Sequence, residues 1–309
     1  MNIYEQIKKN NISTWLILTA FMALLLGIGM GFDYFYGAGI RYPLFTIIAF
    51  VIAVISSYSS YMYGDQLVLS STHAREPNPD DIKEKQWQDV VEEMSVAAGL
   101  PMPQVYVTDD PDPNAFATGR DPAHSSIVAT RGLLDILNRE ELQAVASHEM
   151  SHIRNYDTRL LLIVAVLVGS VTLLAGWAGR MFYWGRGDRD RRSGGAAALV
   201  MLVIWLVAVI LSPILSRLIA MCVSRKREYL ADASGAELTR NPTALADALE
   251  KINSHYQPSQ YINEGTSHLC IADPQNHALG SQEGWLADIF ATHPPIQKRI
   301  EILKQMAYK

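Results

Sequence analysis

Residues 138–157 read N-R-E-E-L-Q-A-V-A-S-H-E-M-S-H-I-R-N-Y-D and carry the strongest chemical signal in the chain. Asn138 is followed three residues later by Glu141, a capping-box pattern that predicts the start of a helix. Within this helix His148, Glu149 and His152 form the motif H-E-x-x-H. Because residues four apart share one face of a helix, both imidazoles can reach a single metal ion from one rigid element.

The motif is typical of zinc metalloproteases. Glu149, next to the first histidine, can reach a water on the metal without binding the metal itself. Zinc acts as a Lewis acid and lowers the pKa of that water to about 7, and a carboxylate collects the proton and passes it to the leaving amine. The alternative is a surface helix that happens to hold two histidines, and the helix cap just upstream argues against it.

A catalytic zinc site needs a third protein ligand and an open fourth position. No H-x-x-G-x-x-H extension follows His152, so the third ligand must come from elsewhere in the chain. The best candidate is Glu228. Asp232 lies one helical turn further on, so that one of the two carboxylates can bind the metal while the other orients a ligand histidine. Asn155 and Asp157 are expected to orient the helix end and the ligands.

Four long apolar runs occupy residues 15–32, 43–63, 160–177 and 196–222. Each can cross a hydrocarbon core, which takes about 20 helical residues at 1.5 Å per residue. We therefore expect four transmembrane helices. They divide the chain into an N-terminal transmembrane hairpin (1–64), a first catalytic part with the H-E-x-x-H helix (65–159), a second transmembrane hairpin (160–222) and a second catalytic part with the third zinc ligand (223–309).

Four crossings would place the N-terminus and both catalytic parts on the same side of the membrane. Basic residues cluster near the helix ends on that side. By the positive-inside bias this side is cytoplasmic. The basic loop from Arg180 to Arg192 would lie on the other side. Either the folded parts dictate the orientation of the second hairpin, or that pair of runs does not fully cross.

Composition excludes some functions. The net charge is −5 and no basic stripe interleaved with aromatic residues appears, so nucleic acid is not an expected partner. The two cysteines, Cys222 and Cys270, cannot form a disulfide framework.

The segments outside the apolar runs predict a mainly α fold with a small β-sheet. Helices are indicated at residues 80–99, 225–238, 243–256 and 295–307, and strands at 104–108 and 126–129. An exposed sheet edge near Asn114 to Gly119 and Ser126 to Ala129 would bind an extended substrate by strand addition. The candidate residues for this edge are Asn114, Ser126 and Val128.

Several segments, in one order over nearly the whole chain, carry a family resemblance. They are Pro113 to Gly119, Glu141 to Asp157, Ser224 to Asp232, and Thr292-His293-Pro294-Pro295 with Arg299. In these segments the chain resembles the HtpX-type integral-membrane zinc proteases, relatives of the type I CAAX prenyl proteases. The resemblance implies His148, His152 and Glu228 as ligands of one zinc ion and Glu149 as the base.

The same resemblance implies a gluzincin-like catalytic domain facing the cytoplasm, in a multi-pass protein of the bacterial inner membrane. Its usual task would be quality control of membrane proteins, with misfolded or damaged membrane proteins as substrates.

His293 precedes two prolines that hold the chain extended and can aim its ring at the site. It is a candidate donor to the oxyanion or a cap on the resting zinc, and packing of the final helix is the alternative.

The spacing also predicts where the site lies. His152 precedes the third apolar run by eight residues, about 12 Å along a continuous helix, and Glu228 follows shortly after the fourth run. The site would therefore lie close to the lipid surface, and substrates would be membrane proteins or their cytoplasmic loops.

Two alternatives to this function are a CAAX-type prenyl-protein protease, whose relatives have more membrane helices, and a non-catalytic membrane scaffold stabilised by zinc. Glu149 beside an apparently complete ligand set argues against the scaffold.

Overall fold

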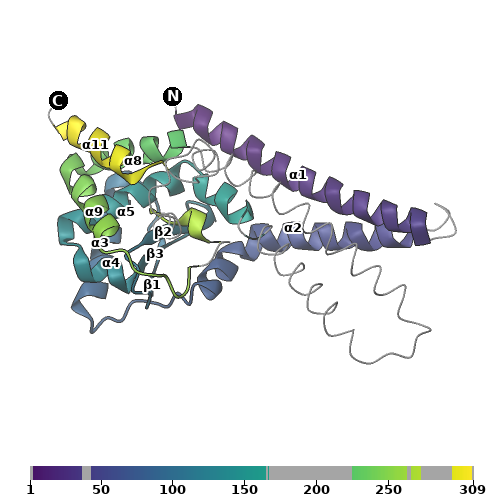
Figure 1. Ribbon diagram of the computed structural model, residues 1–309, viewed down its shortest axis with the longest axis horizontal. Helices are drawn as coiled ribbons and strands as arrows, with labels where there is room; N and C mark the ends of the chain where they lie inside the picture. The colour runs from purple at the N-terminus through teal and green to yellow at the C-terminus, as the bar shows by residue number, and fades with distance from the viewer. Residues whose placement is uncertain are drawn as a thin grey trace.

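The structure, a computed structural model, describes residues 3–36, 43–164, 166, 225–262, 266–272 and 294–307. Its described helices and strands are α1 (Ile3–Tyr36), α2 (Leu44–Ser71), α3 (Ile82–Ala98), β1 (Gln104–Thr108), β2 (Ala115–Asp121), β3 (His124–Thr130), α4 (Arg131–Ile136), α5 (Arg139–Arg154), α8 (Arg225–Thr239), α9 (Pro242–Ser254), the 3-10 helix η1 (Ser267–Leu269) and α11 (Ile296–Ala307). The fold is mainly helical with one small sheet, as the sequence predicts. Two long helices extend away from a mixed domain (Figure 1).

The two long helices, α1 and α2, run antiparallel as a hairpin (Figure 1). Each is long and apolar enough to cross a membrane, with candidate spans at Ile7–Gly27 and Thr46–Ser71. The third and fourth apolar runs lie outside the described residues, except for 160–164 and 166. Large apolar side chains, including Leu16, Ile47 and Ile55, point outward from the hairpin, as expected of a surface that meets lipid.

The hairpin is closed at its outer end by a polar contact between its helices. Pro43 precedes α2 and has no side chain that can cap it. The carboxylate of Asp33 in α1 takes this role, because its Oδ2 accepts hydrogen bonds from Thr46 N at 2.9 Å and Thr46 Oγ1 at 2.6 Å. At the other end, α2 passes residue 64 without a break and buries Val68 and Leu69 in the mixed domain.

The sheet has the strand order β1-β3-β2, with β1 parallel and β2 antiparallel to β3. Successive side chains of a strand point to opposite faces, and here both faces are buried. One face packs against α3 and α5 through Val105, Val107, Ala117, Ile127 and Ala129. The other packs against the end of α2 and the helical residues 157–164 through Tyr106, Phe116 and Val128.

The expected substrate edge at Ser126 and Val128 is wrong, because β3 is the central strand and pairs on both sides. The run Ile127-Val128-Ala129 has no polar residue, as is typical of a strand covered on both faces. Strand β2 is one of the two outer strands of the sheet, and its Ala115 carbonyl accepts a hydrogen bond from Ile271 N at 2.9 Å. Asn114 is buried just before β2 and its amide donates to the carbonyl of Ala272 at 2.8 Å.

The H-E-x-x-H helix, α5, begins as predicted. Asn138 Oδ1 accepts from Glu141 N at 3.0 Å and Glu141 Oε2 accepts from Asn138 N at 2.8 Å, which completes the capping box. The helix does not continue toward the third apolar run. It ends at Asn155, Tyr156 adopts a left-handed conformation with φ of 59°, and a new helix starts at residue 157. The distance of about 12 Å along a continuous helix therefore does not apply, and the break turns Asp157 back toward His152.

The second catalytic part packs against the first. Helix α8 lies along α5, and α9 and α11 cover the outer side of this pair (Figure 1). Gly235 of α8 allows this close approach, because a Cβ at this position would lie 3.0 Å from His148 N and 3.2 Å from His148 Cα. The contact places the third predicted ligand next to the two histidines.

Candidate metal centre

The two histidines of α5 are buried and point to one place. His148 is fully buried and His152 is 8% exposed. Their Nε2 atoms lie 3.2 Å apart, although their rings are nearly perpendicular. The four-residue spacing on α5 thus brings two metal-binding nitrogens together, as the motif predicts.

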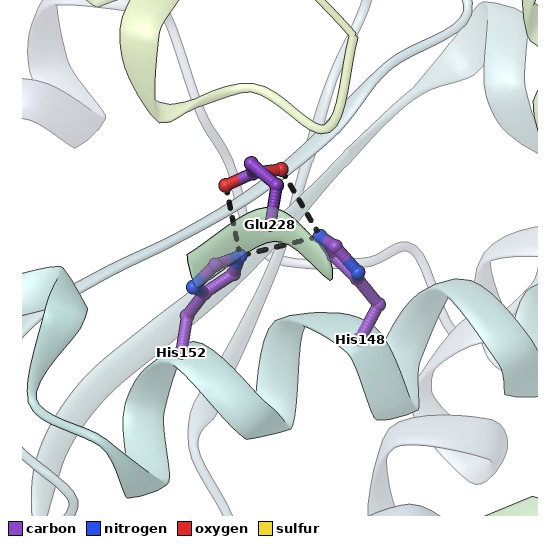
Figure 2. Close-up of side chains that lie close together, drawn as sticks. All are labelled: His148, His152 and Glu228. Carbon is purple, nitrogen blue, oxygen red and sulfur yellow. Dashed lines mark hydrogen bonds and ion pairs between the residues drawn. The ribbon is translucent and has the colours of Figure 1, made fainter. Parts of the chain in front are cut away.

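Glu228 of α8 completes the cluster (Figure 2). Its Oε2 lies 3.8 Å from His148 Nε2, its Oε1 lies 3.5 Å from His152 Nε2, and the ligand atoms of all three residues lie within 4.8 Å of one another. A tetrahedral zinc with nitrogen and oxygen ligands at 2.0–2.1 Å would space those ligands about 3.3 Å apart. The donor set and its spacing therefore fit one zinc ion.

The second ring nitrogen of His148 faces Asp232, one turn after Glu228. His148 Nδ1 lies 3.0 Å from Asp232 Oδ1. The fully buried guanidinium of Arg299 donates to both carboxylate oxygens, at 2.8 and 2.7 Å, and to the carbonyl of Ile271 at 2.7 Å. Burial alone would raise the pKa of Asp232, but Arg299 and His148 outweigh it and hold that pKa below its usual range. Asp232 is thus an ionised acceptor. Arg299 Nη1 also lies 3.5 Å from Glu228 Oε2, and Glu228 is the carboxylate that faces the two Nε2 atoms.

His152 has an equivalent arrangement with a different carboxylate. Its Nδ1 lies 3.1 Å from Asp157 Oδ2. Burial lowers the pKa of His152, but the contact with Asp157 and the charge of Glu228 outweigh it and raise that pKa to about 9. The other oxygen of Asp157 accepts from Asn10 Nδ2 at 2.7 Å and Arg227 Nη1 at 3.3 Å.

Asn155 contributes less directly than predicted. It is the C-cap of α5, and its side-chain nitrogen lies 3.5 Å from Ser151 Oγ. Asp157, not Asn155, contacts the ligand. Asn10 was not identified from the sequence, because it lies in the polar stretch Lys8 to Asn11 and no spacing signal connects it to α5.

Glu149 lies beside the cluster with the surroundings expected of a proton acceptor. It is 1% exposed, and no described residue offers its Oε1 a hydrogen bond. Burial raises the pKa of its carboxyl group, although the two histidines oppose this. Leaving a buried carboxylate oxygen without a donor is costly, so this atom fits a site that is completed by a water molecule.

His293 lies outside the described residues, so its role stays a prediction. The chain is described again from Pro294 and Pro295, and α11 begins at the next residue. Arg299 on α11 connects this part of the chain to the cluster through Asp232.

Comparison with known proteins gives the family. The sequence model of peptidase family M48 matches residues 81–307. The chain belongs to peptidase family M48. It is 40% identical over 309 residues to a protease HtpX homolog of Streptococcus gordonii, covering 98% of this chain and all of that one. It is 41% identical over 307 residues to a protease HtpX homolog of Limosilactobacillus fermentum, with the same coverage of both chains.

A solved structure shares the fold. The crystal structure of S. mikatae Ste24p aligns with a TM-score of 0.51 and 16% sequence identity, over 97% of this chain and 67% of that one. Family membership makes this M48 protein a metalloprotease, and the HtpX homologues together with the two long apolar helices indicate a membrane protein with protein substrates. The family implies a metal ion, typically zinc, and the cluster of His148, His152 and Glu228 is compatible with it.

Proposed function

We propose that this M48 protein is a zinc-dependent endopeptidase that cleaves misfolded or damaged membrane proteins, with Glu149 as the general base. The observation that carries the proposal is the convergence of His148, His152 and Glu228 beside a buried carboxylate oxygen of Glu149. A third ligand that is a glutamate on a separate helix supports the gluzincin-like arrangement implied by the sequence.

The chain's own residues divide the chemistry between them. When bound, zinc would supply a Lewis acid and lower the pKa of a water to about 7. Glu149 takes the proton of the attacking water and passes it to the leaving amine. Asp232 and Asp157 hold the two imidazoles with Nε2 toward the metal.

The place of the site supports a substrate in or near the bilayer. Asn10, which lies within the candidate span Ile7–Gly27, donates to the Asp157 that contacts His152. The metal centre is thus two side-chain contacts from a membrane helix.

We propose four membrane spans in two hairpins, the inner membrane of a bacterium as the location, and a catalytic domain on the cytoplasmic side. Strand addition by the substrate would then use the part of β2 beyond Phe116, because the start of this strand already pairs with Cys270 and Ile271.

Glu149→Gln tests the proposal directly. The purified full-length wild type should hold one zinc per chain and degrade casein, and a chelator should abolish the activity. Glu149→Gln should retain the metal but lose activity by about 10²–10⁴-fold, the usual contribution of a positioned base. Glu140→Gln, an exposed residue of the same helix, is the matched control and should keep the wild-type rate. Equal degradation by wild type and Glu149→Gln would favour a non-catalytic scaffold instead.

A further inference from the structure

Asn10 is a buried polar residue in the polar-rich segment Lys8 to Thr14, near the start of the first membrane helix. It is 3% exposed and lies in the first turns of α1, inside the candidate span. Its side-chain nitrogen donates to the carbonyl of Asn155 at 2.9 Å and to Asp157 Oδ1 at 2.7 Å, and its oxygen accepts from Arg227 Nη1 at 3.2 Å. Both polar atoms of this side-chain amide therefore form hydrogen bonds, and each partner lies more than a hundred residues away in sequence.

These partners belong to the two segments that carry the metal ligands. Asp157 contacts His152 through its Oδ2, and Arg227 immediately precedes Glu228. The amide oxygen faces the guanidinium and the amide nitrogen faces two acceptors, so only one orientation of the amide satisfies all three contacts. Asn10 thus joins the end of α5 and the start of α8 at one point on α1.

The contact does more than dock α1. Asp157 has two oxygens, and the direction of Oδ2 toward His152 depends on what holds Oδ1. Asn10 supplies the shorter of the two donors there, at 2.7 Å against 3.3 Å for Arg227. Removing it would leave Oδ1 of this buried carboxylate with the single, longer hydrogen bond from Arg227 and with freedom to turn, so that Oδ2 could move away from the imidazole.

We propose that Asn10 is a positioning residue of the metal centre, which acts through Asp157 on the orientation of His152. The first membrane helix thereby helps to set the geometry of a metal ligand. The inference rests on the proposed zinc site, and it adds to that site a determinant outside the catalytic parts of the chain.

The chain offers a close control in Asn11. This neighbour also anchors α1, because its Oδ1 accepts from Arg159 Nη1 at 3.0 Å, but within the described part of the chain no contact of Asn11 leads to a residue that touches a ligand. The test uses full-length protein in detergent: wild type, Asn10→Ala, Asn10→Asp and Asn11→Ala. Asn10→Asp keeps the volume and removes both donors, so its effect cannot come from a cavity. Zinc affinity is measured by chelator competition and coordination by the visible absorption of the cobalt-substituted protein.

Both Asn10 variants should bind zinc about tenfold more weakly, at the lower end of the loss seen when partners of a ligand histidine are removed. Their cobalt spectra should change in intensity, whereas Asn11→Ala should match the wild type in both measurements. Thermal unfolding of the metal-free proteins shows whether each variant is folded. Wild-type affinity and spectrum in folded Asn10→Asp, or an equal change in Asn11→Ala, would overturn the inference.

A failure of the zinc site itself would look different. Glu228→Gln is included for this reason: if the wild type binds zinc and cobalt and Glu228→Gln does not, the site stands and the Asn10 variants are decisive. If the wild type binds neither metal, the proposed function fails first.

Discussion

Each histidine of the cluster uses both ring nitrogens, and the two nitrogens face different partners. Nε2 points toward Glu228, and Nδ1 points toward a carboxylate that is itself held by an arginine. A carboxylate behind a ligand histidine fixes its tautomer and makes it a stronger ligand. The ion pair of Asp232 and Arg299 is the more buried of these two supports, with both side chains almost inaccessible to solvent.

Loss of the charge on Asp232 should therefore affect both stability and metal binding. Asp232→Asn leaves Arg299 as a buried cation without its bidentate partner, which should cost about 3–5 kcal/mol. It should also weaken zinc binding by about 10–100-fold. Thermal unfolding of the metal-free protein and chelator competition measure the two effects. Glu237→Gln, an exposed charge loss on the same helix, should change neither. Equal unfolding temperatures for the two variants would contradict the structural role of the pair.

At the residue scale, local signals in the sequence carried most of the prediction. The spacing of His148 and His152 is a property of one helix, so it could be read without knowing the fold. The structure brings Glu228 to them, in agreement with the resemblance. Asn10 could not be found in this way, because its partners come from the end of α5 and the start of α8, and nothing in the sequence sets it apart from the adjacent Asn11.

Between elements, the critical contact is the one between α5 and α8. Gly235 lies against the backbone of His148, so the helix carrying Glu228 approaches the helix carrying both histidines as closely as a glycine permits. Glycine in the middle of a helix normally costs up to about 1 kcal/mol relative to alanine. At this position the close approach outweighs that cost.

Gly235→Ala should destabilise the protein even though alanine is the better helix former. Its methyl group would meet backbone atoms at 3.0–3.2 Å, which cannot move away without separating α5 from α8. We expect a loss of about 1–3 kcal/mol, as for other overpacked contacts, and weaker zinc binding. Gly27→Ala is the control, because no described atom lies within 4 Å of a Cβ there. An unfolding temperature for Gly235→Ala at or above the wild-type value would show that the helices adjust freely.

Element boundaries were predictable where the chain carries explicit start and stop signals. Examples are Asn138 with Glu141 at the start of α5, and Gly99, in a left-handed conformation, after α3. The position of β3 within the sheet was mispredicted, because strand order depends on pairing between distant segments. The break after α5 was not predicted, because Asn155 and Tyr156 include neither glycine nor proline.

For the whole molecule, the hairpin of α1 and α2 is fixed to the catalytic domain at both of its inner ends. Asn10 and Asn11 anchor α1, while Val68 and Leu69 of α2 lie in a core cluster with Phe116 and Val128 of the sheet. The metal centre is therefore held at a constant height relative to the membrane spans. A substrate held in the same bilayer would remain within reach of it.

Membrane attachment of a substrate should therefore raise its rate of cleavage. The protein is reconstituted in vesicles with a peptide loop placed between two transmembrane segments, or with the same loop free in solution. At equal amounts of loop, we expect cleavage of the attached loop to be faster by about tenfold or more, because confinement raises its effective concentration. Glu149→Gln vesicles give the background. Equal rates for the two forms would remove the preference for membrane substrates from the proposed function.

The discontinuity of the ligand set has a consequence for biosynthesis. The ribosome delivers His148 and His152 well before Glu228, and residues 160–222, with two of the apolar runs, come in between. A nascent chain that has completed α5 therefore holds only two of the three ligands, and Arg299, which fixes Asp232, is made later still. Peptidase activity can arise only after those intervening residues have been made and α8 has docked on α5. The order of synthesis thus delays activity until both segments that carry the proposed ligands have been made.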